Sequence, residues 1–179
     1  MRGRIHSEAV KIDLGCGKKK REGHLGLDNS ATSAADVVCD FRRGLPLRND
    51  SCDGAVADNL LEHLPDLIGF MNELWRVMRD GAEVQVIVPY YTSAGAHQDP
   101  THVRFFTEKT FLYFNASLPY DYGFRGKFDI TAFELVANPE FAREVTGVPF
   151  PIAVKYFWNA VSNLIVTLRA DKKYRLSVR

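Results

Sequence analysis

A short turn with two glycines follows the first apolar segment of the chain. In Lys11-Ile-Asp-Leu-Gly-Cys-Gly17, Gly15 and Gly17 have no side chain, so a ligand can approach the backbone closely. Asp13 is a carboxylate at the end of an otherwise apolar strand, and a buried anion there needs a cation or hydrogen-bond donors. The motif therefore suits a positively charged ligand better than a phosphate.

Carboxylates also follow the next two apolar runs. Asp28 ends the run 25–28 and can accept hydrogen bonds from two ribose hydroxyls. Asp40 follows the run 35–39 and can accept from an exocyclic amine, while Phe41 beside it can lie against a purine ring. These residues favour a ligand that contains a nucleoside.

The spacing of these residues argues against a dinucleotide. A dinucleotide site needs G-x-G-x-x-G and an acid about 20 residues further on. Here Lys20 occupies the place of the last glycine, and Asp28 follows Gly15 by only thirteen residues. A nicotinamide-dependent oxidoreductase is therefore disfavoured.

Two histidines and a carboxylate lie close together in His97-Gln-Asp-Pro-Thr-His102. The cluster resembles a metal-ligand set, which a hydrolase would use to activate water. Pro100 stiffens the segment and no second cluster supplies further ligands, so we assign no metal. The alternatives are loop hydrogen bonding, or substrate binding and general-base catalysis by His102 or His97 with Asp99.

The elements that carry these residues alternate along the first half of the chain. Apolar runs predict strands over 9–14, 25–28, 35–39, 52–57 and 83–89. Residues 66–78 repeat apolar side chains at helical spacing, and we expect Gly81 to end that helix. Strand, connection and strand in succession predict an α/β fold with a doubly wound sheet.

The second half of the chain is rich in aromatic residues. We expect a helix over 107–114 that Thr107 caps, strands over 127–137 and 163–170, and helix within 150–162. Fifteen of the 21 aromatic residues lie between Phe105 and Trp158. They fit a core, an apolar acceptor pocket or a subunit contact.

Composition excludes several classes of protein. The chain has 179 residues, a length that suits a single domain over 1–179. Its 23 basic residues are balanced by 22 acidic ones, which disfavours duplex nucleic acid as a partner. The sequence has no apolar run of the roughly 18 residues that span a membrane, and no apolar segment of a secretory signal. Cys16, Cys39 and Cys52 lack the spacing of a disulfide scaffold or zinc ribbon. We expect a cytoplasmic protein.

The order of the motifs resembles the class I S-adenosylmethionine-dependent methyltransferases, in particular the methyltransferase type 11-like domain. The resemblance is collinear and covers about residues 9–90. The matching stretches are Asp13-Leu-Gly-Cys-Gly17, Gly26-Leu-Asp28, Asp40 with Leu45-Pro-Leu47, Ser51-Cys-Asp-Gly-Ala-Val56, Leu61-Glu-His-Leu64 and Glu73-Leu-Trp-Arg-Val-Met-Arg-Asp-Gly81.

This resemblance implies a Rossmann-like, seven-stranded mixed sheet with its last strand antiparallel. S-adenosylmethionine would lie across the carboxyl ends of the strands, with residues 1–90 as the cofactor-binding half and 91–160 as the acceptor-recognition region. The first motif would face the amino-acid part of the cofactor, and His63 would support the loop near its methionine part. The implied cofactor-binding residues are Asp13, Gly15, Cys16, Gly17, Asp28, Asn29, Asp40, Phe41, Asn59, Leu60 and His63.

The chain also departs from the family pattern. Lys19 stands where the family often has a third glycine, and only seven residues separate Gly17 from the strand at Leu25. A full crossover helix does not fit there, so we expect a shortened first helix. Because few residues precede the first strand, we expect residues 91–160 or another chain to recognise the acceptor.

The resulting hypothesis is methyl transfer from S-adenosylmethionine to a small-molecule acceptor, and the aromatic second half favours an apolar or aromatic one. A non-catalytic S-adenosylmethionine-binding or scaffold subunit is the alternative, and a homodimer or a partner subunit is compatible with either. A metal-dependent hydrolase that uses His97, Asp99 and His102 is the third reading.

Overall fold

The computed structural model describes residues 9–115 and 122–173. The strands are β1 (Lys11–Leu14), β2 (Leu25–Asp28), β3 (Val37–Val38), β4 (Cys52–Asp58), β5 (Met78–Pro89), β6 (Lys127–Ala137) and β7 (Val161–Asp171). The α-helices are α1 (Leu67–Val77), α2 (Ala94–Gln98), α3 (Pro139–Glu144) and α4 (Phe150–Tyr156). Three 3₁₀ turns are η1 (Phe41–Arg43), η2 (Leu61–His63) and η3 (Thr110–Phe114).

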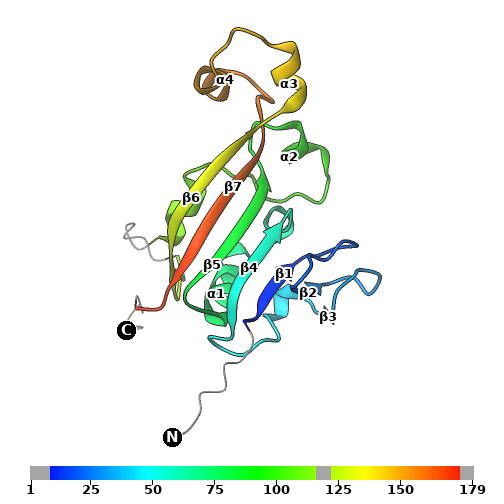
Figure 1. Cartoon of the computed structure of the whole chain (residues 1–179), viewed down its shortest axis with the longest axis vertical. Coiled ribbons are helices and arrows are strands. Elements are labelled where there is room, and N and C mark those ends of the chain that lie inside the picture. Colours follow the sequence, from blue (N-terminus) through cyan, green and yellow to red (C-terminus); the bar gives the residue numbers. More distant parts are fainter. Residues whose placement is uncertain (1–8, 116–121, 174–179) are drawn as a thin grey trace, which may run out of the picture.

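The strands form one mixed sheet in the order β3-β2-β1-β4-β5-β7-β6 (Figure 1). The pairs among β1 to β5 are parallel, and β7 is antiparallel to both β5 and β6. The order reverses between β1 and β4, which makes the carboxyl ends of these two strands a topological switch point. The seven-stranded sheet with its last strand antiparallel, which the family resemblance implied, is confirmed.

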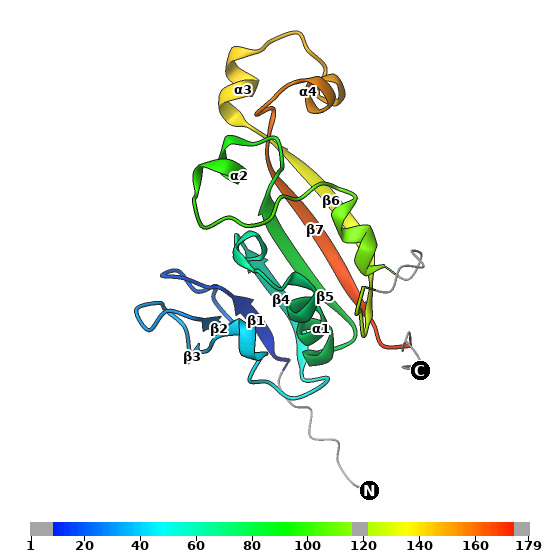
Figure 2. The same ribbon diagram turned by 180° about the vertical axis from the view of Figure 1, so that it is seen from behind.

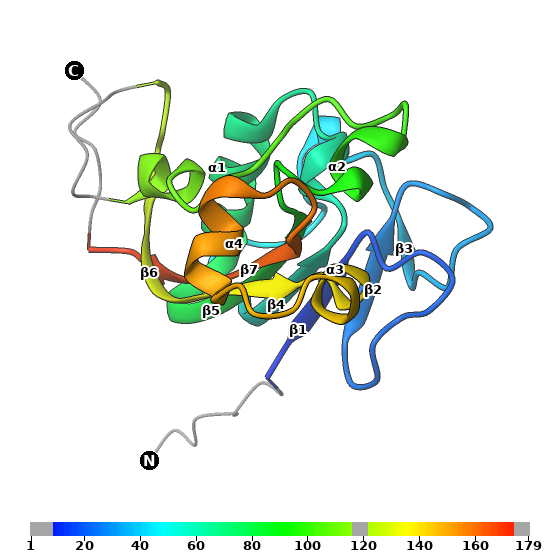
Figure 3. The ribbon, with the colours of Figure 1, turned by 90° about the horizontal axis from the view of Figure 1, so that it is seen from above.

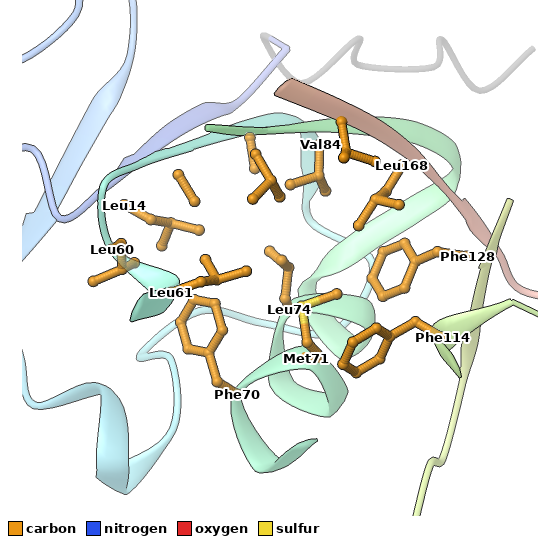
Figure 4. Close-up of a cluster of buried hydrophobic side chains, with 14 of the residues drawn as sticks. Leu14, Leu60, Leu61, Phe70, Met71, Leu74, Val84, Phe114, Phe128 and Leu168 are labelled. Atoms are coloured by element: carbon orange, nitrogen blue, oxygen red, sulfur yellow. The ribbon is translucent and has the colours of Figure 1, made fainter. Parts of the chain in front are cut away.

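One face of the sheet packs against α1 (Figures 2 and 4). Asp66 begins this helix by accepting a hydrogen bond from the Gly69 amide at 2.8 Å. The apolar side of the helix is buried against inward-facing side chains of the strands, such as Val84 and Leu168. Its buried residues are Leu67, Phe70, Met71, Leu74 and Val77.

The other face of the sheet is open to solvent across its centre. Glu83, Gln85 and Arg169 alternate with the buried residues of β5 and β7, and all three are exposed. The hydrophobic core of the described residues is therefore concentrated between the sheet and α1.

The connection from β1 to β2 contains no helix. The first crossover helix, which we expected to be shortened, is therefore missing altogether. Two contacts fold these residues back over the end of the sheet. The Asp13 carboxylate accepts a hydrogen bond from the Arg21 amide at 2.8 Å. The Lys20 side chain packs on Gly26, where a Cβ would lie 2.7 Å from its Cδ.

The end of α1 differs from the prediction. The helix ends at Val77 and the chain passes directly into β5, with Gly81 inside the strand at a φ of 76°. The amides of Asp50 and Ser51 donate to the carbonyls of Arg76 and Val77, at 3.0 and 2.9 Å. Because a neighbouring segment satisfies these carbonyls, no glycine cap is needed.

The predicted helix over 107–114 was also wrong in its start and its type. Only Thr110–Phe114 is helical, as a 3₁₀ turn, and the Thr107 hydroxyl accepts from the Lys109 amide outside it. Phe106 pairs with Tyr90 in an isolated β-bridge, which keeps the backbone extended at this point. The helical turn therefore begins only at Thr110.

β6 and β7 reach past the other strands and carry α3 and α4 at their tip, which we call the arm (residues 138–160; Figures 1 and 3). The strand predictions for 127–137 and 163–170 and the helix prediction within 150–162 are confirmed. The helices α2 and α3 were not predicted, because each is only five or six residues long and has little periodicity to detect.

Replacing Gly126 with alanine should destabilise the protein by about 1–3 kcal/mol. A Cβ at this position would overlap the indole ring of Trp75. The ring cannot easily move, because its Nε1 donates to the Asp171 carbonyl at 3.0 Å and the Lys172 ammonium lies 3.9 Å from its centre. Urea unfolding followed by circular dichroism measures the loss.

Gly54→Ala is the matched control for this substitution. A Cβ at Gly54 meets only ordinary contacts, 3.6 Å from the Lys11 side chain and 3.7 Å from the Glu83 carbonyl. Equal unfolding midpoints for the two variants would contradict the proposed overlap with Trp75.

Candidate active site

A cavity of about 680 Å³ lies at the carboxyl edge of the parallel strands, across the switch point between β1 and β4. We call it the strand-end cavity. Its lining residues are Gly15, Asp28, Asn29, Asp40, Phe41, Arg42, Asn59, Leu60, His63, Leu64, Pro65 and Thr101. The structure thus brings together eight of the eleven residues that the sequence implied for cofactor binding.

Gly15 lets the chain turn closely past the cavity after β1. Its φ of 67° lies in the left-handed region, and its amide donates to the Leu27 carbonyl at 2.8 Å. A Cβ here would lie 3.1 Å from the Leu60 Cδ1 atom, on the other side of the switch point. A side chain at this position would therefore crowd the cavity.

Asp28 anchors the loops on both sides of it. One carboxylate oxygen accepts from the Gly17 amide and the other from the Ser30 amide, each at 2.8 Å. The residue is 7% exposed and lines the strand-end cavity. Since each carboxylate oxygen has two lone pairs, the group can still accept hydrogen bonds from a ligand.

Asp40 is already paired with Arg42, a cavity residue that the sequence analysis missed. The Arg42 guanidinium donates to both carboxylate oxygens, at 2.9 and 2.8 Å, and lowers the pKa of Asp40 to about 2. Asp40 also begins η1 by accepting from the Arg42 amide. An exocyclic amine that binds here would share this carboxylate with the guanidinium. Phe41, which is buried against Phe70 at a ring distance of 5.8 Å, forms the adjacent wall.

Asp13, Cys16 and Gly17 lie beside the strand-end cavity and do not line it. Asp13 is 3% exposed and holds the loop after β1 through the Arg21 amide. Burial raises the pKa of the Cys16 thiol, helped by the nearby carboxylates of Asp28 and Asp13. In the structure these three residues support the loop that carries Gly15.

The turn after β4 brings Asn59, Leu60 and His63 to the cavity. Asn59 adopts a φ of 49° and begins a sharp change of direction into η2. The loop from Asp99 to Arg104 runs alongside this turn, where the Val103 amide donates to the Glu62 carbonyl at 2.9 Å. Thr101 reaches the cavity in this way, from about 40 positions further along the chain, so no local sequence signal could reveal it.

The loop separates the two histidines of the predicted cluster. The His97 ring stacks on Phe105 at 4.5 Å and its Nε2 lies 2.9 Å from the Tyr91 carbonyl. The His102 ring lies 4.7 Å from that of His63 instead, with its Nε2 3.9 Å from Asp99. His97 is thus absent from the group of side chains that forms around His102.

Glu62 completes this group and was not predicted as a site residue. It is 1% exposed, and within the described residues neither carboxylate oxygen has a hydrogen-bond partner. Burial raises its pKa to about 7. An acid in such an environment is typical of functional sites.

A second cavity of about 570 Å³ adjoins the first and shares Asn59 and His63 with it. We call it the adjoining cavity. It lies between the turn after β4, α2 and the arm. Its other lining residues are Glu62, Pro89, Ser93, Ala94, Gly95, Gln98, Asp99, His102, Asn138, Glu140, Asn159, Ser162 and Asn163.

The chain matches the methyltransferase domain family over residues 19–86. A S-adenosylmethionine-dependent methyltransferase from Archaeoglobus fulgidus has 16% identity and a TM-score of 0.66, over 90% of this chain and 86% of that one. A chain in the complex between the Haloferax volcanii Trm112 methyltransferase activator and a candidate methyltransferase has 18% identity and a TM-score of 0.64, over 97% and 87%.

A third similar structure is geranyl diphosphate C-methyltransferase from Streptomyces coelicolor A3(2), in complex with Mg²⁺, geranyl diphosphate and S-adenosyl-L-homocysteine. It has 15% identity and a TM-score of 0.62, over 92% of this chain and 74% of that one. Comparison with curated protein sequences gave no match.

The domain match and the sheet order agree with each other and with the resemblance of the motifs. Residues 19–86 therefore match the methyltransferase domain family, and the chain has the fold of the S-adenosylmethionine-dependent methyltransferases. Within the described residues, no helix is both long and apolar enough to cross a membrane.

Proposed function

We propose that this protein binds S-adenosylmethionine in the strand-end cavity and transfers its methyl group to a small polar acceptor in the adjoining cavity. The observation that carries the proposal is the convergence of Gly15, Asp28 and Phe41 on one cavity at the switch point. Ligands of open α/β sheets bind at this place.

The cavity offers a suitable group for each part of the cofactor. The backbone at Gly15 leaves room for the amino-acid part, and Asp28 can accept hydrogen bonds from the ribose hydroxyls. Phe41 can lie against adenine, with Arg42 and Asp40 at its polar edge. The methyl group would then lie near Asn59 and His63, which border both cavities.

Methyl transfer from a sulfonium is an in-line displacement. The methyl carbon bonds to the acceptor atom while its bond to sulfur breaks, and the electron pair of that bond stays on sulfur. The main contribution of the protein is to hold the acceptor atom in line at about 3–3.5 Å from the methyl carbon. Two cavities that meet at Asn59 and His63 favour this geometry.

The adjoining cavity favours a polar acceptor over the apolar or aromatic one that we first expected. Twelve of its fifteen lining residues have polar or ionisable side chains, such as Gln98, Asn138 and Glu140. The aromatic residues described in the second half do not line this cavity. Phe106 and Phe111, for example, are buried in the core, and Trp158 is exposed on the arm. Hydrogen bonding should therefore select the acceptor.

Calorimetric titration with S-adenosylmethionine and S-adenosylhomocysteine tests the proposal. We expect saturable binding of both, at one site per chain, and at least ten-fold weaker binding to Gly15→Ala, because its Cβ would press on Leu60 at the cavity wall. Absence of binding to the wild-type chain at millimolar ligand would overturn the proposal.

Gly23→Ala is the matched control for Gly15→Ala. Gly23 also has a positive φ, of 71°, but nothing lies within 4 Å of the Cβ it would gain. The two variants therefore share the backbone strain and differ in the contact with the cavity. Equal losses of affinity would show that strain, and not occupancy of the cavity, is responsible.

A methylation screen separates the enzyme from a non-catalytic binding subunit. Polar small molecules are supplied with S-adenosylmethionine that carries a labelled methyl group, and label in the product is measured. Transfer to an acceptor supports the enzyme. Cofactor binding without transfer, alone and with an added activator subunit, would favour the binding subunit.

A further inference from the structure

Glu62 is a carboxylate that the fold removes almost completely from water. It is 1% exposed, and neither of its oxygens accepts a hydrogen bond in the described part of the chain. Burying a carboxylate in this way is costly unless a cation or hydrogen-bond donors compensate for the lost water. The methyl-transfer proposal gives this residue no task, so its burial calls for another explanation.

His102 presents a free nitrogen lone pair beside this carboxylate. Its Nδ1 lies 3.0 Å from the Ala96 carbonyl oxygen. A carbonyl oxygen only accepts hydrogen bonds, so Nδ1 carries the proton and Nε2 of the neutral ring has the lone pair. Metal-binding histidines are commonly oriented by such a bond from the second ring nitrogen.

His63 is oriented in the same way through two polar side chains. The Thr101 hydroxyl donates to the Asp99 carboxylate at 2.6 Å, and the same oxygen lies 2.9 Å from the His63 Nδ1. Since the single hydroxyl proton goes to Asp99, Nδ1 of His63 must be the donor to Thr101. The Nε2 atom of His63 is therefore also left with its lone pair.

We propose that Glu62, His63 and His102 bind one divalent transition-metal ion. Their potential ligand atoms lie within 4.8 Å of one another, and they form the only such group of three in residues 9–115 and 122–173. A metal with ligands at about 2.0–2.2 Å would draw the side chains closer by small rotations. Two imidazoles and one carboxylate suit Zn²⁺, Mn²⁺, Fe²⁺ or Co²⁺ better than Ca²⁺ or Mg²⁺, which prefer oxygen ligands.

The site would lie in the wall of the adjoining cavity, because all three side chains line it. Three protein ligands leave further coordination positions, which water or an oxygen atom of a bound molecule can occupy. The site would therefore help to hold polar, oxygen-bearing molecules in this cavity. It goes beyond the proposed methyl transfer and does not depend on it, and it replaces the general-base role that the sequence suggested for His102.

The test uses the untagged protein, purified, treated with chelator and titrated with Co²⁺, Mn²⁺ and Zn²⁺. Calorimetry measures the stoichiometry, and the visible absorption of the Co²⁺ complex reports the ligand environment. We expect one ion per chain. Glu62→Gln and His102→Ala should each weaken Zn²⁺ binding at least 100-fold, while His97→Ala should retain wild-type affinity, because His97 lies outside the group.

Each outcome decides the proposal. Absence of stoichiometric binding to wild-type protein, or an equal loss in His97→Ala, would overturn it. Circular dichroism shows whether the buried Glu62→Gln variant folds, and His63→Gln, at one of the two partly buried histidines, is the substitute if it does not. Titration of the same chelator-treated sample with S-adenosylhomocysteine tests the cofactor site separately, so failure of one site is distinguishable from failure of the other.

Discussion

Replacing Asp28 with alanine should weaken binding of S-adenosylmethionine by about 100-fold or more. Hydrogen bonds to a charged group are worth about 1.5–3 kcal/mol each, and two ribose hydroxyls would lose theirs. The substitution also removes the acceptors for the Gly17 and Ser30 amides, which hold the loops at the strand-end cavity. Calorimetric titration of S-adenosylhomocysteine gives the change in Kd.

Asp36→Ala is the matched control for this prediction. Asp36 also holds the loop after β1, because it accepts from the Gly26 amide at 2.8 Å and pairs with Lys20 at 2.7 Å. It does not line the strand-end cavity. If loosening of the loop alone explained the loss, Asp36→Ala would reproduce it. Wild-type affinity in Asp28→Ala would contradict the assignment of this carboxylate to the ribose.

Replacing Leu74 with alanine should lower the free energy of unfolding by about 2–5 kcal/mol. Leu74 is fully buried between α1 and the sheet, in the cluster that includes Phe70 and Met71 (Figure 4). The other face of the sheet is exposed at its centre, so this one layer supplies most of the apolar burial. The loss would be a large part of the about 5–15 kcal/mol typical of a domain.

Urea unfolding compares Leu74→Ala with Ile68→Ala on the same helix. Ile68 is only partly buried, so its truncation leaves a smaller cavity and removes less apolar contact. The midpoint of Leu74→Ala should fall further at an unchanged slope. A loss no larger than that of Ile68→Ala would show that the layer under α1 relaxes around the cavity.

Local patterns were sufficient to predict most of the elements. Strands such as β1 and β4 appear as short apolar runs, and α1 appears as an apolar stripe at helical spacing, because these patterns depend on neighbouring residues. The glycine turn and the acids that end strands indicated the edge where the strand-end cavity lies. Parallel strands bring their carboxyl ends to one edge, so Gly15, Asp28 and Asn59 come together.

The features that sequence reasoning missed depend on contacts between distant segments. Gly81 does not end α1, because the amides of Asp50 and Ser51 reach its last carbonyls. Thr101 lines the strand-end cavity because its loop pairs with the turn after β4, where the Val103 amide donates to the Glu62 carbonyl. Such partners are chosen by three-dimensional proximity, which spacing along the chain does not report.

The loop that carries His97 and His102 shows most clearly which features are local in sequence and which depend on the fold. Spacing along the chain grouped His97 with His102, and the fold instead turns His97 toward Phe105. Backbone pairing of Val103 with Glu62 brings His102 to a carboxylate and a histidine that lie about 40 residues earlier. The chain by itself therefore predicted the sheet and the edge where the strand-end cavity lies, because periodicity and turn chemistry are local. Tertiary packing decided which ionisable side chains meet and which lose their water, because both depend on distance in space.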